Sequence, residues 1–432
     1  MKIQKGAIFM KKNNVKFQVE ESEKQSWGSI SMIWIGAMIS VSMLMLGGTL
    51  IGGMSFKDAI ISGLIGYSIV AIIMCFQGIM GADLGLPTVS MATSALGEKG
   101  SRIITSISIG VACLGWFALQ ANVTGAAFST MVESMGGPSI PVTVSSVVWG
   151  LIMLTTAVYG IKALKYLNYI AVPSLIITCI YGVYKSIALN GWSNIVNSQP
   201  AEPMSMLMAV SISVGSFALA AVIGADYTRY ARSRQDVIKS SLLGVIPVGI
   251  LMIMAGAIMA VSVGSADIGA VFISLGVPVI GIISLILATW TTNAVNAFSG
   301  GLAITNLFNL GEDKRKMATA VAGIIGTLLA VTGIMDYFVQ FLTVLTTAIP
   351  PVGGVIIADY WIINKGKKEN FTPKEGVNWN GVISFLGGSL AATFITVGIQ
   401  PITGIITSMV MYVGIHYITA AVKNKEQIGE NI

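Results

Sequence analysis

Residues 32–53 read MIWIGAMISVSMLMLGGTLIGG, an uncharged apolar run that contains glycine at Gly36 and again at Gly47 and Gly48. A run of this length can cross a hydrocarbon core of about 30 Å as a helix. Membrane helices tolerate breaks where the irregular backbone lines a cavity enclosed by protein. The stretch therefore predicts a transmembrane helix that is interrupted near Gly36.

Similar apolar runs recur along the whole chain, each with at least about 18 residues. They predict an all-α membrane protein with about twelve transmembrane helices. The predicted spans cover residues 28–54, 57–79, 101–131, 139–160, 166–189, 204–226, 238–263, 269–304, 317–334, 337–361, 379–396 and 400–422. The eighth run is long enough for one helix and a preceding hairpin, and the Pro-Pro pair at 350–351 predicts a re-entrant turn or a hinge.

The composition agrees with a lipid environment. Of the 432 residues, 54% are hydrophobic and only 10% are charged, a balance that a water-soluble globule of this size does not show. The 49 glycines suit membrane helices, where small residues let backbones approach closely. The three cysteines all lie in apolar runs, so we expect no disulfide framework.

Basic residues fall almost entirely on one side of the predicted topology. If the N-terminal tail is cytoplasmic, 23 of the 25 lysines and arginines lie on the inner side, and only Lys57 and Lys185 lie outside. This asymmetry predicts a multi-pass protein of the cell membrane with both termini in the cytoplasm. It also accounts for the net charge of +6 without nucleic acid as a partner.

The chain divides most simply into a transport core and an appended helix pair. We expect a cytoplasmic tail at 1–27, a ten-helix core at 28–362 with repeats at about 28–189 and 204–362, a cytoplasmic loop at 363–378, two peripheral helices at 379–423, and a cytoplasmic tail at 424–432. Glycines interrupt the first and the sixth span, five spans apart. Interruptions at corresponding positions are typical of inverted repeats that hold substrate and ion near the membrane midplane.

Ionisable residues are nearly absent from the middle of the spans, which favours a neutral substrate. Asp226, Asp336 and Asp359 fall at predicted helix ends. A carrier of charged solutes or a proton pump usually keeps an acid or base inside the membrane. The single histidine, His416, receives no role.

Two groups of residues suit a planar ring that forms hydrogen bonds. Trp116 and Gln120 are four residues apart and share one helix face, where a flat ring lies beside an amide. Ser216 and Phe217 directly follow Gly215, so a second ring and a hydroxyl adjoin a possible helix break. The alternative is structural: an interfacial tryptophan, a glutamine that bonds another helix, and a phenylalanine in the core or facing lipid.

A third group suits a monovalent cation. Thr291 and Thr292 present two hydroxyls in ATWTTN, directly before Asn293. An unwound segment near Gly36 to Ile39 would add backbone carbonyls. The alternative is that both hydroxyls bond carbonyls one turn earlier in their own helix.

At these residues the sequence resembles the nucleobase:cation symporter-1 family, above all its bacterial cytosine and purine-cytosine permease branch. The resemblance covers roughly 28–423 and rests on GGTL at 47–50, GWFALQ at 115–120, VGSF at 214–217, ADYTRYARS at 225–233, WTTN at 290–293 and IPPVGGVIIADY at 349–360. It implies a LeuT-type fold of five-plus-five inverted repeats with two peripheral helices. It also implies alternating access driven by a cation gradient, with no cofactor other than a probable sodium ion.

The resemblance also implies residue roles. Trp116 and Phe217 correspond to the aromatic platforms of the base, and Gln120, Gly215 and Ser216 correspond to its polar readers. The sodium ligands would be backbone oxygens of Gly36, Ile39 and Ala288 and hydroxyls of Thr291 and Thr292, with Asn293 beside both sites.

Two departures keep the substrate open. Cys113 stands where cytosine permeases resemble one another in having glutamine, and Leu219 stands where a second serine is expected. The later amide, at Gln120, is more similar to hydantoin and allantoin carriers. Cytosine is favoured, while a purine, a hydroxymethylpyrimidine or a cyclic ureide is the alternative, and an amino-acid symporter of the same fold is a more distant one. A channel or a membrane enzyme would need a polar pore or a catalytic cluster, which the sequence lacks.

Overall fold

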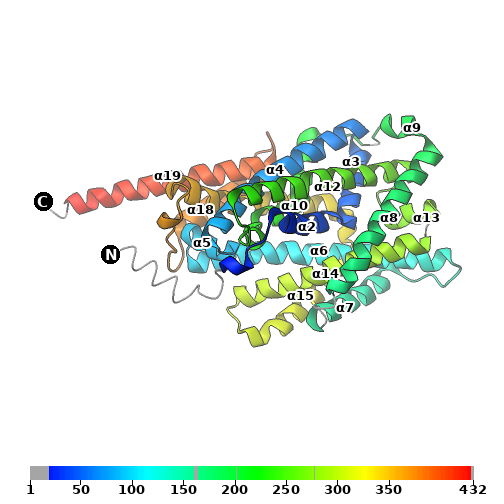
Figure 1. Cartoon of the computed structure of the whole chain (residues 1–432), viewed down its shortest axis with the longest axis horizontal. Coiled ribbons are helices and arrows are strands. Elements are labelled where there is room, and N and C mark those ends of the chain that lie inside the picture. Colours follow the sequence, from blue (N-terminus) through cyan, green and yellow to red (C-terminus); the bar gives the residue numbers. More distant parts are fainter. Residues whose placement is uncertain (1–18, 160–163, 201, 277, 430–432) are drawn as a thin grey trace.

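The computed structural model describes residues 19–159, 164–200, 202–276 and 278–429, and within them the protein is a helical bundle (Figure 1). Residues 1–18 of the predicted N-terminal tail, Lys162 and residues 430–432 lie outside the described residues. The all-α prediction is confirmed for the described part of the chain.

The bundle contains the following helices in chain order. They are α2 (Trp27–Met38), α3 (Val41–Gly53), α4 (Phe56–Leu84), α5 (Thr88–Leu96), α6 (Glu98–Ser134), α7 (Val142–Tyr159), α8 (Leu164–Asn190), α9 (Trp192–Val196), α10 (Met206–Val222), α11 (Ala225–Thr228), α12 (Arg234–Val263), α13 (Ile268–Ser274), α14 (Pro278–Leu307), α15 (Arg315–Ala330), α16 (Phe338–Ala348), α17 (Pro350–Ile357), α18 (Trp379–Phe394) and α19 (Gln400–Gly429). The short 3₁₀ segments are η1 (Glu21–Glu23), η3 (Glu312–Lys314), η4 (Ile334–Tyr337) and η6 (Lys368–Asn370), and η5 (Ala358–Ile363) is a π-helix.

Among the described residues, nine helices are long and apolar enough to cross a membrane, and the bent pair α2 and α3 makes a tenth. Helices α15 and α18 occupy two further predicted spans, but each has only 16 residues. A helix of that length covers roughly 24 Å, less than an average hydrocarbon core. The count of twelve spans therefore stays a prediction.

The first span is broken, as its glycines predict. Helices α2 and α3 are bent by 57° about the two residues between them. The Ser40 amide donates to the Met38 carbonyl at 2.9 Å, and the Met43 amide donates to the Ser40 carbonyl at 3.2 Å. In a continuous helix these two amides would donate to the carbonyls of Gly36 and Ile39. The break therefore releases both carbonyl oxygens from the helical ladder.

The sixth span is also irregular. Phe217 has φ −129° and ψ 15° inside α10, a conformation that interrupts the helix. The irregular residue is one position after the predicted Gly215-Ser216 break. After α10, the short helix α11 continues the span.

Close helix crossings depend on glycine. A side chain at Gly47 would overlap the backbone of α12 at Ile253, and one at Gly256 would overlap the backbone of α3 at Leu44. These reciprocal contacts let α3 and α12 approach backbone to backbone.

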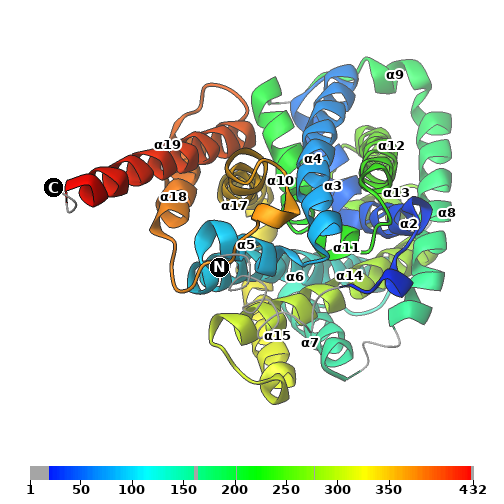
Figure 2. The ribbon, with the colours of Figure 1, turned by 60° about the vertical axis from the view of Figure 1, so that its left-hand side comes forward.

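The helices fall into two groups that pack mainly within themselves (Figure 2). One group contains α2, α3, α4, α10 and α12, and the other contains α6, α7, α14 and α15. Helix α8 packs against both α12 and α14. The broken helices α2/α3 and α10 belong to the first group, while Trp116 and Thr291 lie on helices of the second.

Two of the predicted spans are divided into shorter helical segments. Residues 334–363 form one span in which α17 follows α16 at Pro350 and a π-helix begins at Ala358. The chain does not turn back at the Pro-Pro pair, so the re-entrant alternative is wrong and the hinge stays a prediction. The eighth run is divided into the short helix α13 and the long helix α14.

Helices α18 and α19 pack against each other and against α17, at the side of the bundle (Figure 2). Helix α19 extends beyond its neighbours (Figure 1). The division into a core, a loop and a peripheral pair stays a prediction.

Candidate functional site

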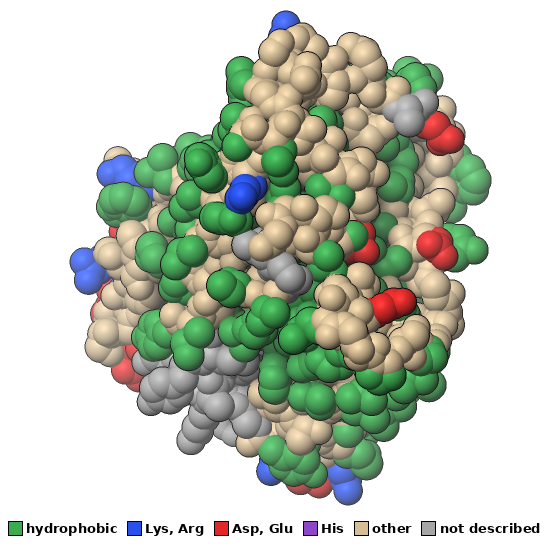
Figure 3. Space-filling model, turned by 90° about the vertical axis from the view of Figure 1, so that its right-hand side faces the viewer, with side chains coloured by type: hydrophobic (Ala, Val, Ile, Leu, Met, Phe, Trp, Pro, Cys, Tyr) green, Lys and Arg blue, Asp and Glu red, His purple; other side chains and the backbone are tan. Residues whose placement is uncertain are grey.

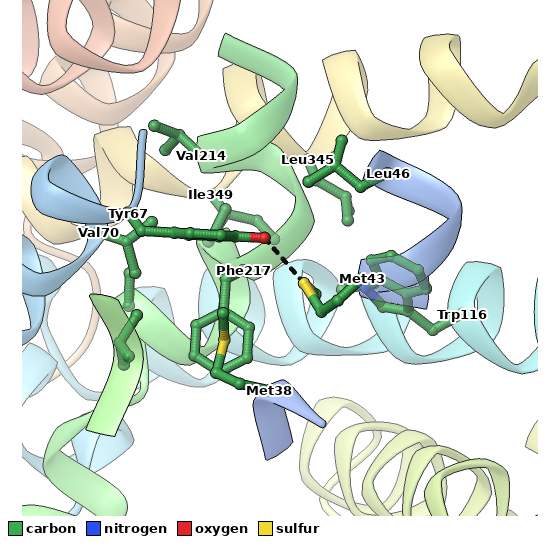
Figure 4. Packing of buried hydrophobic residues seen from close by; sticks show 14 of the residues in the cluster. Met38, Met43, Leu46, Tyr67, Val70, Trp116, Val214, Phe217, Leu345 and Ile349 are labelled. Carbon is green, nitrogen blue, oxygen red and sulfur yellow. Dashed lines mark hydrogen bonds between the residues drawn. The ribbon is translucent and has the colours of Figure 1, made fainter. Parts of the chain in front are cut away.

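The two predicted aromatic platforms belong to one buried cluster where the two helix groups meet. Trp116 comes from α6 and Phe217 from the irregular turn of α10, and they are 9% and 8% exposed. Met43 on α3 and Tyr67 on α4 join the same cluster (Figure 4). These four residues thus come from one helix of the second group and three helices of the first.

Trp116 is held edge-on by two rings of α16. The ring centroids of Trp116 and Phe341 are 5.2 Å apart at 83°, and those of Trp116 and Phe338 are 6.5 Å apart at 68°. Gly115 leaves room for the Phe341 ring, which a side chain at that position would overlap. Edge-to-face packing with two neighbouring rings fixes the plane of the indole ring.

Gln120 lies one turn after Trp116 and is 4% exposed. No residue in the described part of the chain forms a hydrogen bond with its amide. Its neighbour Asn122, by contrast, donates to the Ala330 carbonyl at 2.9 Å. Buried amides normally have partners, so an amide without one is a candidate for ligand recognition.

Gly215 is required by packing. A side chain there would overlap the Leu342 carbonyl and the Thr346 hydroxyl of α16. The Thr346 hydroxyl in turn donates to the Ser211 carbonyl at 2.9 Å, which ties α16 to α10. Ser216 is buried, and its hydroxyl donates to the Ser213 carbonyl at 2.7 Å.

Phe217 packs edge-on against Trp34 of α2, with ring centroids 6.5 Å apart. Trp34 packs in the same way against Tyr227 at 5.1 Å. This line of rings joins the irregular turn of α10 to the first half of the broken first span. A displacement of α2 would therefore change the packing of the Phe217 ring.

Asn293 joins its helix to two others, and one of its partners directly follows Trp116 in the chain. It is fully buried, and its amide nitrogen donates to the Phe117 carbonyl at 3.0 Å and to the Met153 sulfur at 3.3 Å. These bonds join α14 to α6 and α7. Its role beside the substrate stays a prediction.

The predicted cation ligands lie in two places. The freed carbonyls of Gly36 and Ile39 are at the break of the first span, and Thr291 and Thr292 both donate to the Ala288 carbonyl at 3.0 Å within α14. Helix α14 packs against α3, the second half of the broken span. The donor set consists of neutral oxygens, which fits a hard monovalent cation, although both hydroxyls have intrahelical partners.

A cavity of about 340 Å³ opens at the end of the bundle that carries α13. Its lining includes Thr49, Asn122, Asp267, Asp336 and Phe338. Because Phe338 also packs against Trp116, the cavity reaches the far side of the aromatic cluster. Figure 3 looks onto this end and shows separate acidic side chains among hydrophobic and uncharged ones.

At the other end, which we call the basic end because Arg234 and Lys368 lie there, polar bonds join helices beside a second cavity of about 480 Å³. Arg234 of α12 forms a bidentate ion pair with Asp83 of α4 at 2.6 and 2.9 Å. Tyr360 of η5 donates to the same carboxylate at 2.8 Å. Three helices are thus joined at this end, and the 340 Å³ cavity lies at the opposite one.

Sequence reasoning missed several residues of the cluster. Phe338 and Phe341 are three residues apart and share a face of α16, a spacing that could have indicated them. Tyr67, Met43 and Trp34 carry no such signal, because a tyrosine, a methionine or a tryptophan in an apolar span reads as core packing.

A membrane bundle in which two broken helices adjoin a buried aromatic cluster with an unpartnered amide belongs to the class of solute carriers. The chain matches the profile of the family described as permease for cytosine/purines, uracil, thiamine, allantoin over residues 18–417. The chain belongs to this family, and it is a permease and not an enzyme. The resemblance to the nucleobase:cation symporter-1 family is confirmed.

Named relatives agree with this assignment. The chain is 32% identical over 399 residues to the cytosine permease of Escherichia coli strain K12, covering 91% of this chain and 92% of that one. It is 23% identical to the hydantoin permease of Microbacterium maritypicum, covering 89% and 84%. The inward-facing structure of Mhp1 superposes with a TM-score of 0.80 at 21% identity, covering 95% and 96%. Mhp1 is a nucleobase-cation-symport-1 family transporter, so the predicted fold class is confirmed.

Proposed function

We propose that this protein imports a neutral nucleobase, most specifically cytosine, by sodium symport with alternating access. The base stacks on Trp116, and Phe217 covers its other face. The amide of Gln120 and the hydroxyl of Ser216 bond its polar edges. Sodium binds the carbonyl oxygens of Gly36, Ile39 and Ala288 and the hydroxyls of Thr291 and Thr292, with Asn293 beside both sites.

The observation that carries the proposal is the Gln120 side chain, which is 4% exposed, lies one turn from Trp116 and forms no hydrogen bond with the described residues. An amide both donates and accepts, as does the edge of a nucleobase. The identity to the Escherichia coli cytosine permease across nearly the whole chain supports cytosine. Cys113 and Leu219, which depart from the cytosine pattern, keep a purine, a hydroxymethylpyrimidine or a hydantoin or allantoin ring as the alternative.

Sodium coupling is supported by the released carbonyls at the break of the first span and by the two threonine hydroxyls of α14. Unwound carbonyls that coordinate sodium are a known device of carriers with broken helices. Each hydroxyl donates its proton to the Ala288 carbonyl and keeps its oxygen lone pairs, which can coordinate sodium. Binding of the ion would then couple α14 to the first span, which belong to different helix groups.

The test is binding of radiolabelled cytosine to purified protein in sodium and in choline at fixed pH. Unlabelled adenine, hypoxanthine, allantoin and uracil serve as competitors. We expect sodium-dependent binding that Trp116→Ala abolishes. Trp379→Ala is the matched control, because Trp379 lies on α18 with 65% of its surface exposed. Equal binding in choline would contradict sodium coupling.

The competitors separate the alternatives. Stronger displacement by another ring would keep the family and replace cytosine as the substrate. If no heterocycle binds, the proposal fails, and an amino-acid symporter of the same fold becomes the better description. We further propose that the protein resides in the plasma membrane with both termini in the cytoplasm.

A further inference from the structure

Two hydroxyls and one sulfur meet beside the aromatic pair. The Tyr67 hydroxyl donates to the Met43 sulfur at 2.9 Å and lies 3.4 Å from the Ser216 hydroxyl (Figure 4). The Ser216 hydroxyl is 4.0 Å from the same sulfur. Tyr67 is fully buried, and it was not among the predicted site residues.

The proton of each hydroxyl can be placed. Ser216 has one hydroxyl proton, and the Ser213 carbonyl, 2.7 Å away, is its strongest acceptor. Tyr67 then has two acceptors within reach, the Met43 sulfur at 2.9 Å and the Ser216 oxygen at 3.4 Å, and the sulfur is the nearer one. A thioether is a weak acceptor, so this buried donor recovers little of the hydrogen bonding that it loses on leaving water.

Met43 is suited to leave that space. Its side chain is unbranched and adapts to different cavities. It stands three residues after Ser40, where the first span is broken and the backbone is released from helical bonding. Figure 4 shows the sulfur reaching toward Tyr67, with Trp116 on the other side of the Met43 side chain.

We propose that Tyr67 is a specificity-determining residue that donates a hydrogen bond to a ring carbonyl oxygen of the substrate. The Met43 sulfur occupies the position of that oxygen when no base is bound and withdraws when one enters. This inference rests on the proposed function, since it assumes a base stacked on Trp116. It adds a chemical requirement: the preferred rings carry a carbonyl group on the edge that faces α4.

The test combines a variant that lacks the Tyr67 hydroxyl with a ligand that lacks the ring carbonyl. Wild type and Tyr67→Phe are compared for binding of cytosine and of 4-aminopyrimidine, which has no ring carbonyl. Loss of one buried hydrogen bond weakens binding by about tenfold. We expect that loss for cytosine and an unchanged, weaker affinity for 4-aminopyrimidine. An equal loss for both ligands would show that Tyr67 only supports the fold, and it would overturn the inference.

A second variant separates recognition from packing. Met43→Leu keeps most of the side-chain volume and removes the sulfur acceptor. If the Tyr67 bond to Met43 served only to hold α3 against α4, Met43→Leu would lower cytosine affinity as Tyr67→Phe does. We expect instead that Met43→Leu retains or increases the affinity, and that Tyr67→Phe still costs about tenfold in the Met43→Leu background. Met259→Ala, at a buried methionine between α12 and α8, controls for lost volume elsewhere.

Failure of this inference and failure of the proposed function are distinguishable. If wild type binds cytosine in a Trp116-dependent way and Tyr67→Phe binds it equally well, only the role of Tyr67 is refuted. If wild type binds neither cytosine nor any competitor, the proposed function is refuted and the inference falls with it.

Discussion

At Gln120, a role in folding can be tested separately from a role in substrate binding. Its amide has no hydrogen-bond partner among the described residues, so the ligand-free fold gains nothing from it. Gln120→Leu keeps the approximate volume and removes only the amide. We expect thermal stability in detergent to be retained or increased, while cytosine binding weakens by about tenfold.

The matched control is Gln77→Leu. Gln77 is fully buried, and its amide nitrogen donates to the Gly353 carbonyl at 3.1 Å and joins α4 to α17, while its amide oxygen has no partner among the described residues. Base affinity should be unchanged in this variant. If both glutamine variants lose cytosine binding equally, the effect is one of packing, and Gln120 is not a reader of the base.

The sequence predicted which candidate site residues lie together when both are on one face of a single helix. It did not predict contacts between residues on different helices. The i, i+4 spacing of Trp116 and Gln120 predicted their common face, since helical geometry alone decides it. The contacts of Asn293 with Phe117 and Met153 depend on how α14 meets α6 and α7. Met43 and Tyr67 are 24 residues apart and meet only because α3 folds back beside α4.

At the scale of elements, the π-helix η5 connects several helices at the basic end. Asp359 is 4% exposed and accepts hydrogen bonds from Ser94 of α5 at 2.5 Å, Tyr412 of α19 at 2.6 Å and Asn364 at 3.0 Å. The next residue, Tyr360, points to the ion pair of Asp83 with Arg234. Consecutive residues of one turn therefore join the appended helix α19 on one side and the core helices α4 and α12 on the other.

Lys374, in the loop at 363–378, contacts the same group of residues. Its ammonium group lies 3.4 Å from the Tyr412 hydroxyl and 5.9 Å from the centre of the Tyr412 ring. Burial lowers the pKa of Lys374 from its ordinary value, and the nearby Asp359 opposes that shift. The loop at 363–378 is thus anchored to the helix bundle.

Asp359→Ala should destabilise the protein strongly. The variant leaves two buried donors, Ser94 and Tyr412, and the half-buried Asn364 without this acceptor. Loss of one partner in a buried charged cluster costs about 3 kcal/mol or more. We expect a clear drop in the melting temperature of the detergent-purified protein. Asp313→Ala is the control, because that carboxylate is 74% exposed, and it should melt as wild type does. A wild-type melting temperature for Asp359→Ala would show that the cluster contributes nothing to stability.

Hydropathy predicted the elements well because burial in lipid imposes the same requirement on every span. It placed a helix in the position of each predicted span of the described chain. It could not foresee that α15 and α18 are short, since helix ends depend on local capping and packing. Of the two alternatives for the Pro-Pro pair, the re-entrant turn was wrong, because proline is also compatible with the first turn of a new helix, where Pro350 stands.

For the whole molecule, the orientation follows from charge. The inner segments carry 23 of the 25 basic residues under the predicted topology, and Lys57 and Lys185 are the exceptions. Both exceptions lie on helices near the end opposite Arg234. Basic loops are retained on the cytoplasmic side during insertion, so the basic end should face the cytoplasm and the 340 Å³ cavity should face outward.

Cysteine labelling tests this orientation directly. In a background with Cys75, Cys113 and Cys179 replaced, a membrane-impermeant maleimide applied to intact cells should label Lys57→Cys, near the start of α4. Lys368→Cys, in the loop before α18, should be labelled only after the membrane is permeabilised. Both lysines are exposed, so access to the thiol depends on the side of the membrane and not on burial. The opposite pattern would place the cavity on the cytoplasmic side, and the structure would then represent the state from which the base is released inside rather than captured outside.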